Sequence, residues 1–198
     1  ILRANAHGPV RVLIPMISSP EEIIEVKKIM TEVGKKLRKQ GVKITSKDPP
    51  LGAMIETPAA AMSADHLRGV CDFFAIGTND LTMYTLAIDR GDDQVAAMYN
   101  ALHPSILRLI QFSLQSALRM GMSMSICGEI AGDERYTALM IGLGVRELSM
   151  APASLLRVRQ RIRHINADAT RKLAQSVMEE TNSEGMNNLI DKFNSKLF

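Results

Sequence analysis

Short apolar segments alternate with amphipathic segments along most of the chain. Each apolar segment is rich in β-branched or other apolar residues and stops at a proline, a glycine or a polar cluster, which is typical of buried strands. The predicted strands are residues 10–16, 51–57, 73–80, 122–129 and 147–150. Helices are predicted between them and after the last one, so the expected order of elements is βαβαβαβαβαα.

The helix predicted after the first strand begins with a recognisable N-terminal capping sequence. Ser19 is suited to the N-cap, Pro20 to the first helical position, and Glu22 completes a Ser-x-x-Glu capping box. An apolar stripe at helical spacing follows, made of Ile23, Val26, Met30, Val33 and Leu37.

The segment from residue 155 to residue 165 alternates arginine with apolar residues, so a strand is one alternative. A helix is favoured, because its apolar residues also recur at helical spacing. These residues are Leu155, Val158, Ile162 and Ile165. The tail, residues 167–198, is predicted to be helical.

Nearly continuous apolar strands separated by helices indicate an α/β fold with a parallel sheet. Two architectures fit, an open doubly wound sheet and a (β/α) barrel. No Gly-x-Gly-x-x-Gly turn follows a strand, which weakens the dinucleotide-binding form of the open sheet.

Composition narrows the classes of function. The chain is 46% hydrophobic with a net charge of +3, and its acidic residues are spread among the basic ones, so nucleic-acid binding is not expected. The two cysteines have no metal-binding spacing and form no disulfide framework. We expect a cytoplasmic protein that does not cross a membrane. The first residue is Ile rather than Met, and we expect the chain to be part of a longer protein.

Polar residues follow three successive predicted strands, where a (β/α) barrel has its active site. Glu56 lies at the carboxyl end of the second strand, Asn79 and Asp80 at that of the third, and Cys127 at that of the fourth. Carboxylates on neighbouring strands suit Mg²⁺, which takes one or two protein carboxylates and completes its shell with water and substrate oxygens. Arg90 adds a planar cation for phosphate or carboxylate.

A glycine and a cysteine lie at the same carboxyl ends of the predicted strands. Gly77 would let the backbone approach a ligand closely. A free thiol has a pKa of about 8.5, so Cys127 beside a cation could exchange a proton near neutral pH. The glycine after it would leave room for a small substrate.

The run "GAMIETPAAA…FFAIGTNDLTMYTLAIDR…ICGEIAGDE" resembles the phosphoenolpyruvate (PEP)-utilising family. Within it the chain is most similar to the enzyme I group of the bacterial phosphotransferase systems, either the sugar type or its nitrogen-related paralogue. The resemblance implies a PEP–protein phosphotransferase that passes the phosphoryl group to an enzyme histidine and then to a phosphocarrier protein, leaving pyruvate. It also implies a homodimer.

The resemblance assigns roles residue by residue. Glu56 and Asp80 match the family's Mg²⁺ ligands, and Asn79 and Asp80 match its PEP contacts. Arg90 matches an arginine that holds the phosphate. Cys127 matches the residue that protonates the enolate of pyruvate.

The expected domain is residues 1–198, about five of the eight βα units of a TIM-type barrel, with upstream strands and the phosphohistidine domain absent. Five strands would leave two unpaired edges, unless another copy pairs with them. We predict that this chain alone does not phosphorylate a carrier protein from PEP.

Two alternatives remain open on the sequence. A Mg²⁺-dependent pyruvate aldolase or lyase also places Glu and Asp around the metal, but it does not require the Cys-Gly-Glu motif. A non-catalytic dimerisation and PEP-sensing module is the other. The sequence does not distinguish sugar uptake from nitrogen regulation.

Overall fold

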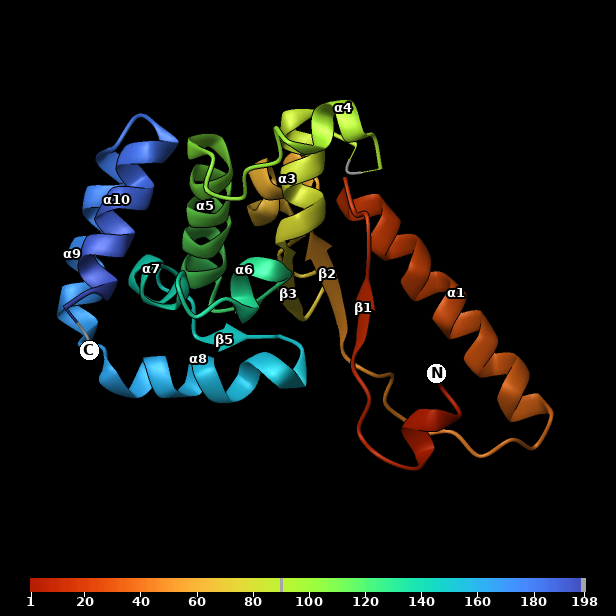
Figure 1. The fold of residues 1–198 in the computed structure, drawn as a ribbon. Coiled ribbons are helices and arrows are strands. Elements are labelled where there is room, and N and C mark those ends of the chain that lie inside the picture. The colour runs from red at the N-terminus through yellow and green to blue at the C-terminus, as the bar shows by residue number, and fades with distance from the viewer. Residues whose placement is uncertain (90, 197–198) are drawn as a thin grey trace.

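Five parallel strands form one sheet in a computed structural model of the chain, which describes residues 1–89 and 91–196, with residue 93 described by its backbone alone. The strands lie in the order in which they occur in the sequence, and Figure 1 shows β1, β2 and β3 side by side. They are β1 (Val12–Ile14), β2 (Leu51–Ile55), β3 (Phe73–Gly77), β4 (Ser123–Cys127) and β5 (Glu147–Leu148).

Helices connect the strands and form the C-terminal part. The α-helices are α1 (Pro20–Lys39), α2 (Pro58–Met62), α3 (Thr78–Leu86), α4 (Asp93–Ala96), α5 (Pro104–Met120), α6 (Glu129–Gly132), α7 (Thr137–Leu143), α8 (Pro152–His164), α9 (Ala167–Glu179) and α10 (Ser183–Asn194). Two short 3₁₀ helices are Ala4–Ala6 and Ala64–Leu67. Within the described ranges, no helix is both long enough and apolar enough to cross a membrane.

The strand order decides between the two architectures. A doubly wound sheet reverses its order at a switch point, whereas successive strands of a (β/α) barrel are neighbours all the way round. The order β1-β2-β3-β4-β5 has no reversal. The predicted α/β fold, part of a TIM-type barrel, is therefore confirmed, and in the described part of the chain β1 and β5 are the outer strands.

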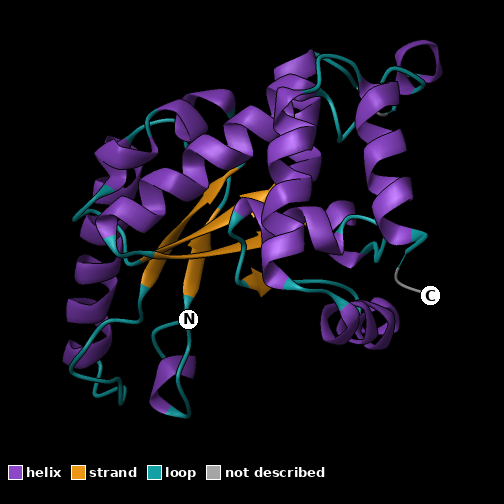
Figure 2. Cartoon of the chain, turned by 90° about the vertical axis from the view of Figure 1, so that its left-hand side faces the viewer, coloured by secondary structure: helices purple, strands orange, loops and turns teal. Residues whose placement is uncertain are grey.

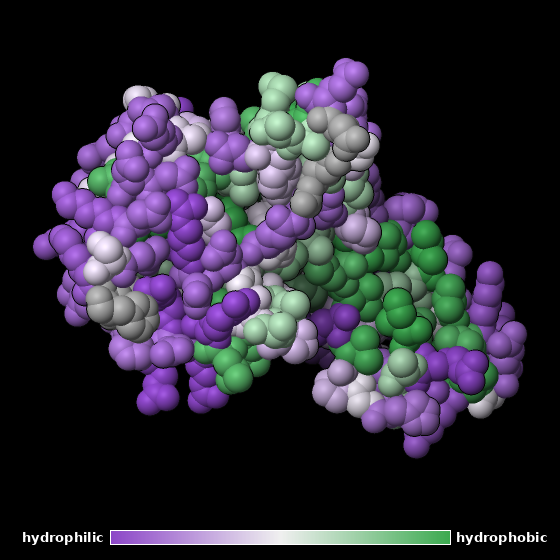
Figure 3. Space-filling model, viewed as in Figure 1, coloured by the Kyte–Doolittle hydropathy of each residue, from purple (hydrophilic) through white to green (hydrophobic). Residues whose placement is uncertain are grey.

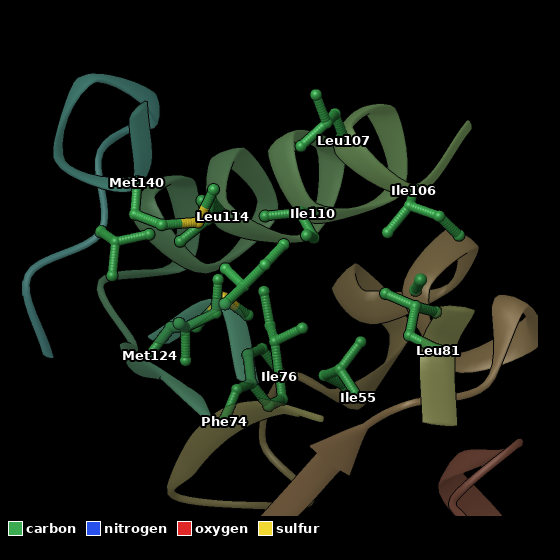
Figure 4. Packing of buried hydrophobic residues seen from close by; sticks show 14 of the residues in the cluster. Ile55, Phe74, Ile76, Leu81, Ile106, Leu107, Ile110, Leu114, Met124 and Met140 are labelled. Carbon is green, nitrogen blue, oxygen red and sulfur yellow. The ribbon is translucent and has the colours of Figure 1, made fainter. Parts of the chain in front are cut away.

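One face of the sheet packs against helices. Side chains alternate between the two faces of a strand, and Phe74 and Ile76 of β3 point toward α5 together with Ile55 of β2. Figure 4 shows them meeting Ile110 and Leu114 of α5. The core of the structure therefore lies between the sheet and α5, and Figure 2 shows most helices on this side of the strands.

The opposite face of the central strands is formed mainly by small residues. At the amino ends of the strands Phe73 fills the available space, because a Cβ on Gly52 would lie 2.3 Å from its ring. The guanidinium of Arg11 lies over the same ring, 3.6 Å from its centroid. The carboxyl ends of the strands hold the polar residues.

Helix α1 begins as predicted, but only part of its apolar stripe is buried. The backbone N–H of Ser19 donates to Glu22 Oε2 at 2.9 Å, as in a capping box. Ile23 is fully buried, whereas Val33 is 40% exposed. The reason is length: 20 helical residues span about 30 Å, and Figure 1 shows α1 extending past the short strand β1.

Helix α8 is confirmed as a helix, but most of its apolar stripe is exposed. Val158 is buried, while Leu155 is 53% and Ile162 42% exposed. The helix lies at the β5 margin of the sheet (Figures 1 and 2). Hydrophobic surface also faces the viewer over the β1 and α1 side in Figure 3.

Several predicted boundaries were wrong. The third strand ends at Gly77 rather than at residue 80, and the fourth ends at Cys127 rather than at residue 129. The stretch between β3 and α5 contains α3 and α4. The segment after Pro58 is split into α2 and a 3₁₀ helix, and the tail breaks between α9 and α10. Side chains cap the N-termini of two of these helices. Thr57 caps α2, and Asn182 caps α10 by accepting from the N–H of Gly185.

Candidate active site

Three predicted site positions form one row across the central strands. Gly77 pairs with Cys127, and Ile76 pairs with Ile55. Glu56 follows Ile55 directly, so the register places Glu56, Gly77 and Cys127 beside one another on the face opposite the core. The row lies at the carboxyl edge of the sheet, as predicted.

The middle residue of the row must be small. A Cβ on Gly77 would lie 2.5 Å from Glu56 Oε2 and 3.3 Å from the sulfur of Met54. Sequence analysis assigned this glycine to the approach of a ligand. In the structure it makes room for the Glu56 side chain.

Glu56 is a buried carboxyl group, only 4% exposed. Burial raises its pKa above the ordinary value, and the neighbouring Asp80 carboxyl raises it further. The backbone N–H of Met16 opposes both effects by donating to Glu56 Oε1 at 2.8 Å. Met16 holds this position with a left-handed backbone, φ 57°, a costly conformation for a residue with a side chain.

Asp80 comes from the next element. It lies in the first turn of α3, where the helix dipole favours negative charge, and it is half-buried beside Glu56. A buried carboxyl group with a second carboxyl group beside it is the kind of pair that a divalent cation stabilises. No group of three or more His, Cys, Asp or Glu side chains in the described ranges is arranged to hold a metal. A pair of carboxylates suits Mg²⁺, whose other ligands can be water and substrate oxygens.

Cys127 completes the row as a half-buried thiol. Its sulfur donates to the carbonyl oxygen of Ile76 at 3.2 Å. Burial raises the pKa of the thiol, and the charges of Glu56 and Asp80 raise it further. Both effects favour the protonated form of the thiol. Cys71, the other cysteine, belongs to the core, and burial raises its pKa to about 11.

Asn79 has its amide oxygen engaged inside the protein. This oxygen accepts from the backbone N–H of Glu129 at 3.1 Å and from the hydroxyl of Tyr99 at 3.5 Å. The side-chain NH₂ group is then what Asn79 can offer to a ligand. Arg90, the predicted phosphate contact, lies outside the described residues.

A surface cleft opens beside the row. Its lining includes Asn79 and Cys127, and also Ser154 and Arg157 of α8. Glu56 and Asp80 are not part of its lining. The cleft therefore reaches the thiol from the side of α8, next to the carboxyl pair.

Sequence analysis missed two residues of this site. Met16 contributes a backbone N–H, which no side-chain pattern can reveal; its position after Pro15 at a strand end was the one available signal. The hydroxyl of Thr78 donates to the carbonyl oxygen of Cys127 at 2.8 Å. Thr78 stands inside the "GTND" run, but only the pairing of β3 with β4 brings it to Cys127.

Comparison with known proteins now assigns the family. Residues 1–167 match the family described as "PEP-utilising enzyme, PEP-binding domain". The chain belongs to this family. The resemblance inferred from the residues is thereby confirmed.

Relatives of this PEP-binding domain extend over nearly its whole length. A phosphoenolpyruvate-protein phosphotransferase of Haemophilus influenzae is 40% identical, covering 98% of this chain and 33% of the relative. One from Cupriavidus necator is 41% identical, covering 93% of this chain and 31% of the relative. The chain thus spans about a third of the length of these relatives.

A solved structure shares the fold. The crystal structure of a citrate lyase from Burkholderia xenovorans matches with a TM-score of 0.57 and 15% identity, covering 100% of this chain and 65% of that one. At this identity the likeness concerns the fold alone. It does not favour the alternative of a lyase activity.

Proposed function

We propose that this domain binds PEP and Mg²⁺ for a PEP–protein phosphotransferase of the enzyme I type. The whole reaction would move the phosphoryl group of PEP to an enzyme histidine outside this chain, then to a phosphocarrier protein, and release pyruvate. The row of Glu56, Gly77 and Cys127, with Asp80 beside it, is the observation that carries the proposal. The names of the relatives support it.

Glu56 and Asp80 are the proposed metal ligands. The buried carboxyl pair and the raised pKa of Glu56 support this assignment. When bound, Mg²⁺ would neutralise charge on the phosphoryl and pyruvyl oxygens. Met16 would keep Glu56 oriented through its backbone N–H.

Asn79 and Arg90 are the proposed phosphate contacts, with Asp80 shared between metal and substrate. The engaged amide oxygen of Asn79 supports its part, since it leaves the NH₂ group to donate to a phosphate oxygen. The role of Arg90 as a phosphate contact is assigned from the family resemblance. Both would stabilise the charge that spreads over the phosphoryl oxygens during transfer.

Cys127 is the proposed proton donor. Once the phosphoryl group has left, the enolate of pyruvate needs a proton at C3. The S–H bond of Cys127 would break, the proton would form a C–H bond, and the resulting thiolate would take a proton from solvent. The protonated state of the half-buried thiol supports this order of events.

The assembly of the whole protein belongs to the same proposal. Residues 1–198 would be part of the barrel domain, and the phosphocarrier would be met through a separate domain. A cytoplasmic homodimer, working in sugar uptake or nitrogen regulation, is what the family resemblance implies. Sedimentation of this chain would show whether it self-associates.

The experiment that tests the proposal replaces Cys127 in a full-length enzyme carrying this chain. Cys127→Ala should lower pyruvate formation about 100-fold or more, the usual contribution of a positioned proton donor, while Mg²⁺ binding is retained. Cys71→Ala removes the other thiol, which lies in the core, and should leave turnover near the wild-type level. Unchanged turnover of Cys127→Ala would exclude the thiol from the mechanism.

A further inference from the structure

Thr78 is a buried polar residue at the junction of two strand ends. It is the first residue of α3, directly after β3, and is 0% exposed. Its hydroxyl donates to the carbonyl oxygen of Cys127 at 2.8 Å, although the two residues are 49 positions apart in the sequence. The α3 corner is thereby bonded to the residue that carries the thiol.

The bond occurs where Cys127 is paired with β3 but no longer with β5. Pairing between β4 and β5 reaches Ile126, which faces Leu148, and the Ile126 carbonyl accepts from the N–H of Ser149. Cys127 is one residue further on. Buried backbone carbonyls need a partner, and the Thr78 hydroxyl supplies it at this position.

The turn after Cys127 is shaped around Thr78. Gly128 has φ 98°, a conformation that favours glycine, and a Cβ there would lie 2.2 Å from Thr78 Oγ1 and 2.9 Å from Asn79 Oδ1. This space was assigned on the sequence to a small substrate. In the structure Thr78 and Asn79 occupy it, and Asn79 also accepts from the N–H of Glu129.

We propose that Thr78 is a positioning residue, which fixes the backbone of Cys127 and so aims the thiol at its substrate. The inference rests on the proposed function, in which that thiol protonates a small enolate. The orientation of the Cys127 backbone sets the direction of its Cα–Cβ bond and hence the reach of the sulfur. A misplacement of about 1 Å at a reacting group can cost about 100-fold in rate, so a single hydroxyl can matter here.

The first test uses three variants in a full-length enzyme carrying this chain. Thr78→Val removes the hydroxyl and keeps the shape; we expect kcat for pyruvate formation to fall at least about tenfold, with the KM for PEP changed by less than about twofold. Thr78→Ser keeps a hydroxyl and should recover most of the rate. Thr82→Val is the matched control, because Thr82 is equally buried on the same helix but donates within it, to the carbonyl of Thr78.

A second pair of variants changes glycines and tests the contact between Thr78 and Cys127 without substituting Thr78. Gly128→Ala should reproduce the loss in kcat, because the added methyl group would displace Thr78. The same methyl group would also press on Asn79 Oδ1, so the KM for PEP is measured too, and a rise in KM would report the loss of the Asn79 contact instead. Gly144→Ala is its control: Gly144 has a similar φ of 108°, but nothing lies within 4 Å of its Cβ position. Both changes strain the backbone, so a loss confined to Gly128→Ala cannot come from that strain alone. This pair also serves if Thr78→Val does not fold.

The outcomes separate this inference from the proposed function. If Cys127→Ala keeps full activity, the proposed function fails. If Cys127→Ala is inactive but Thr78→Val behaves like Thr82→Val, and Gly128→Ala like Gly144→Ala, the thiol is needed and the positioning role of Thr78 is wrong. Failure of Thr78→Ser to recover activity would equally overturn it.

Discussion

The centre of the sheet and its two margins differ in both burial and chemistry. Strands β2, β3 and β4 have five residues each, and every residue of β3 is buried. The outer strands have three and two residues and are only partly buried. Every site residue assigned above to a strand or strand end, apart from the backbone of Met16, comes from the centre. The site is therefore built on the part of the sheet whose packing is complete within this chain.

The margins show the opposite pattern. Beside β5, Leu155 and Ile162 of α8 are exposed, and beside β1, Val33 of α1 is 40% exposed. Apolar stripes at helical spacing normally face a core. The difference between centre and margins shows that helical periodicity can predict a helix correctly while its apolar face stays exposed in this chain.

The largest effect should come from a core substitution at the centre. Ile126→Ala removes a fully buried side chain of β4 and should lower the free energy of unfolding by about 2–5 kcal/mol. Leu155→Ala, at the α8 margin, should cost less than about 0.5 kcal/mol, because this side chain is already 53% exposed. Urea unfolding of this chain measures both, and equal losses would contradict the distinction between centre and margin.

A smaller loss is expected at the middle of the site row. Gly77→Ala would force a methyl group against Glu56 Oε2 and should destabilise the chain by about 1–3 kcal/mol. It should also weaken divalent-cation binding, because Glu56 must move. Gly8→Ala is the matched control, since nothing lies within 4 Å of that position. If both glycines tolerate alanine equally in thermal unfolding, the tight row is wrong.

The smallest effect concerns the charge of Glu56. Its pKa is raised in the folded state, so its ionised form destabilises the fold, and this cost is absent below the unfolded pKa of about 4.5 and grows as pH rises through the folded pKa. In EDTA, Glu56→Gln should therefore raise Tm by roughly 2 °C at pH 7 and not at pH 4. Added Mg²⁺ should stabilise the wild type and not the variant. A variant that is less stable than the wild type at pH 7 in EDTA would contradict the raised pKa.

Sequence alone predicted much of the fold and the edge of the sheet at which the candidate site residues gather. The strand–helix alternation, the capping box at Ser19 and the polar residues after three strands are local signals, and each was found where the pattern placed it. Strand register is not local. The row of Glu56, Gly77 and Cys127, and the bond from Thr78 to Cys127, depend on how three strands pair, so their geometry could not be predicted.

The errors have a common physical cause. Val33, Leu155 and Ile162 satisfy helical periodicity, but their burial depends on neighbours at the margins of the sheet. The helix α3 was missed because its first turn, Thr78 to Asp80, is made of residues that also favour turns. In both cases tertiary context decided between local alternatives.

The most direct test of the central claim is a calorimetric titration of PEP into this chain with and without Mg²⁺. We predict Mg²⁺-dependent binding that Glu56→Gln and Asp80→Asn each weaken at least about tenfold. Asp65→Asn, an exposed acidic residue of a 3₁₀ helix away from the pair, should bind like the wild type. Equal binding by all four proteins, or binding that ignores Mg²⁺, would contradict the claim that these two carboxylates hold the ion for PEP.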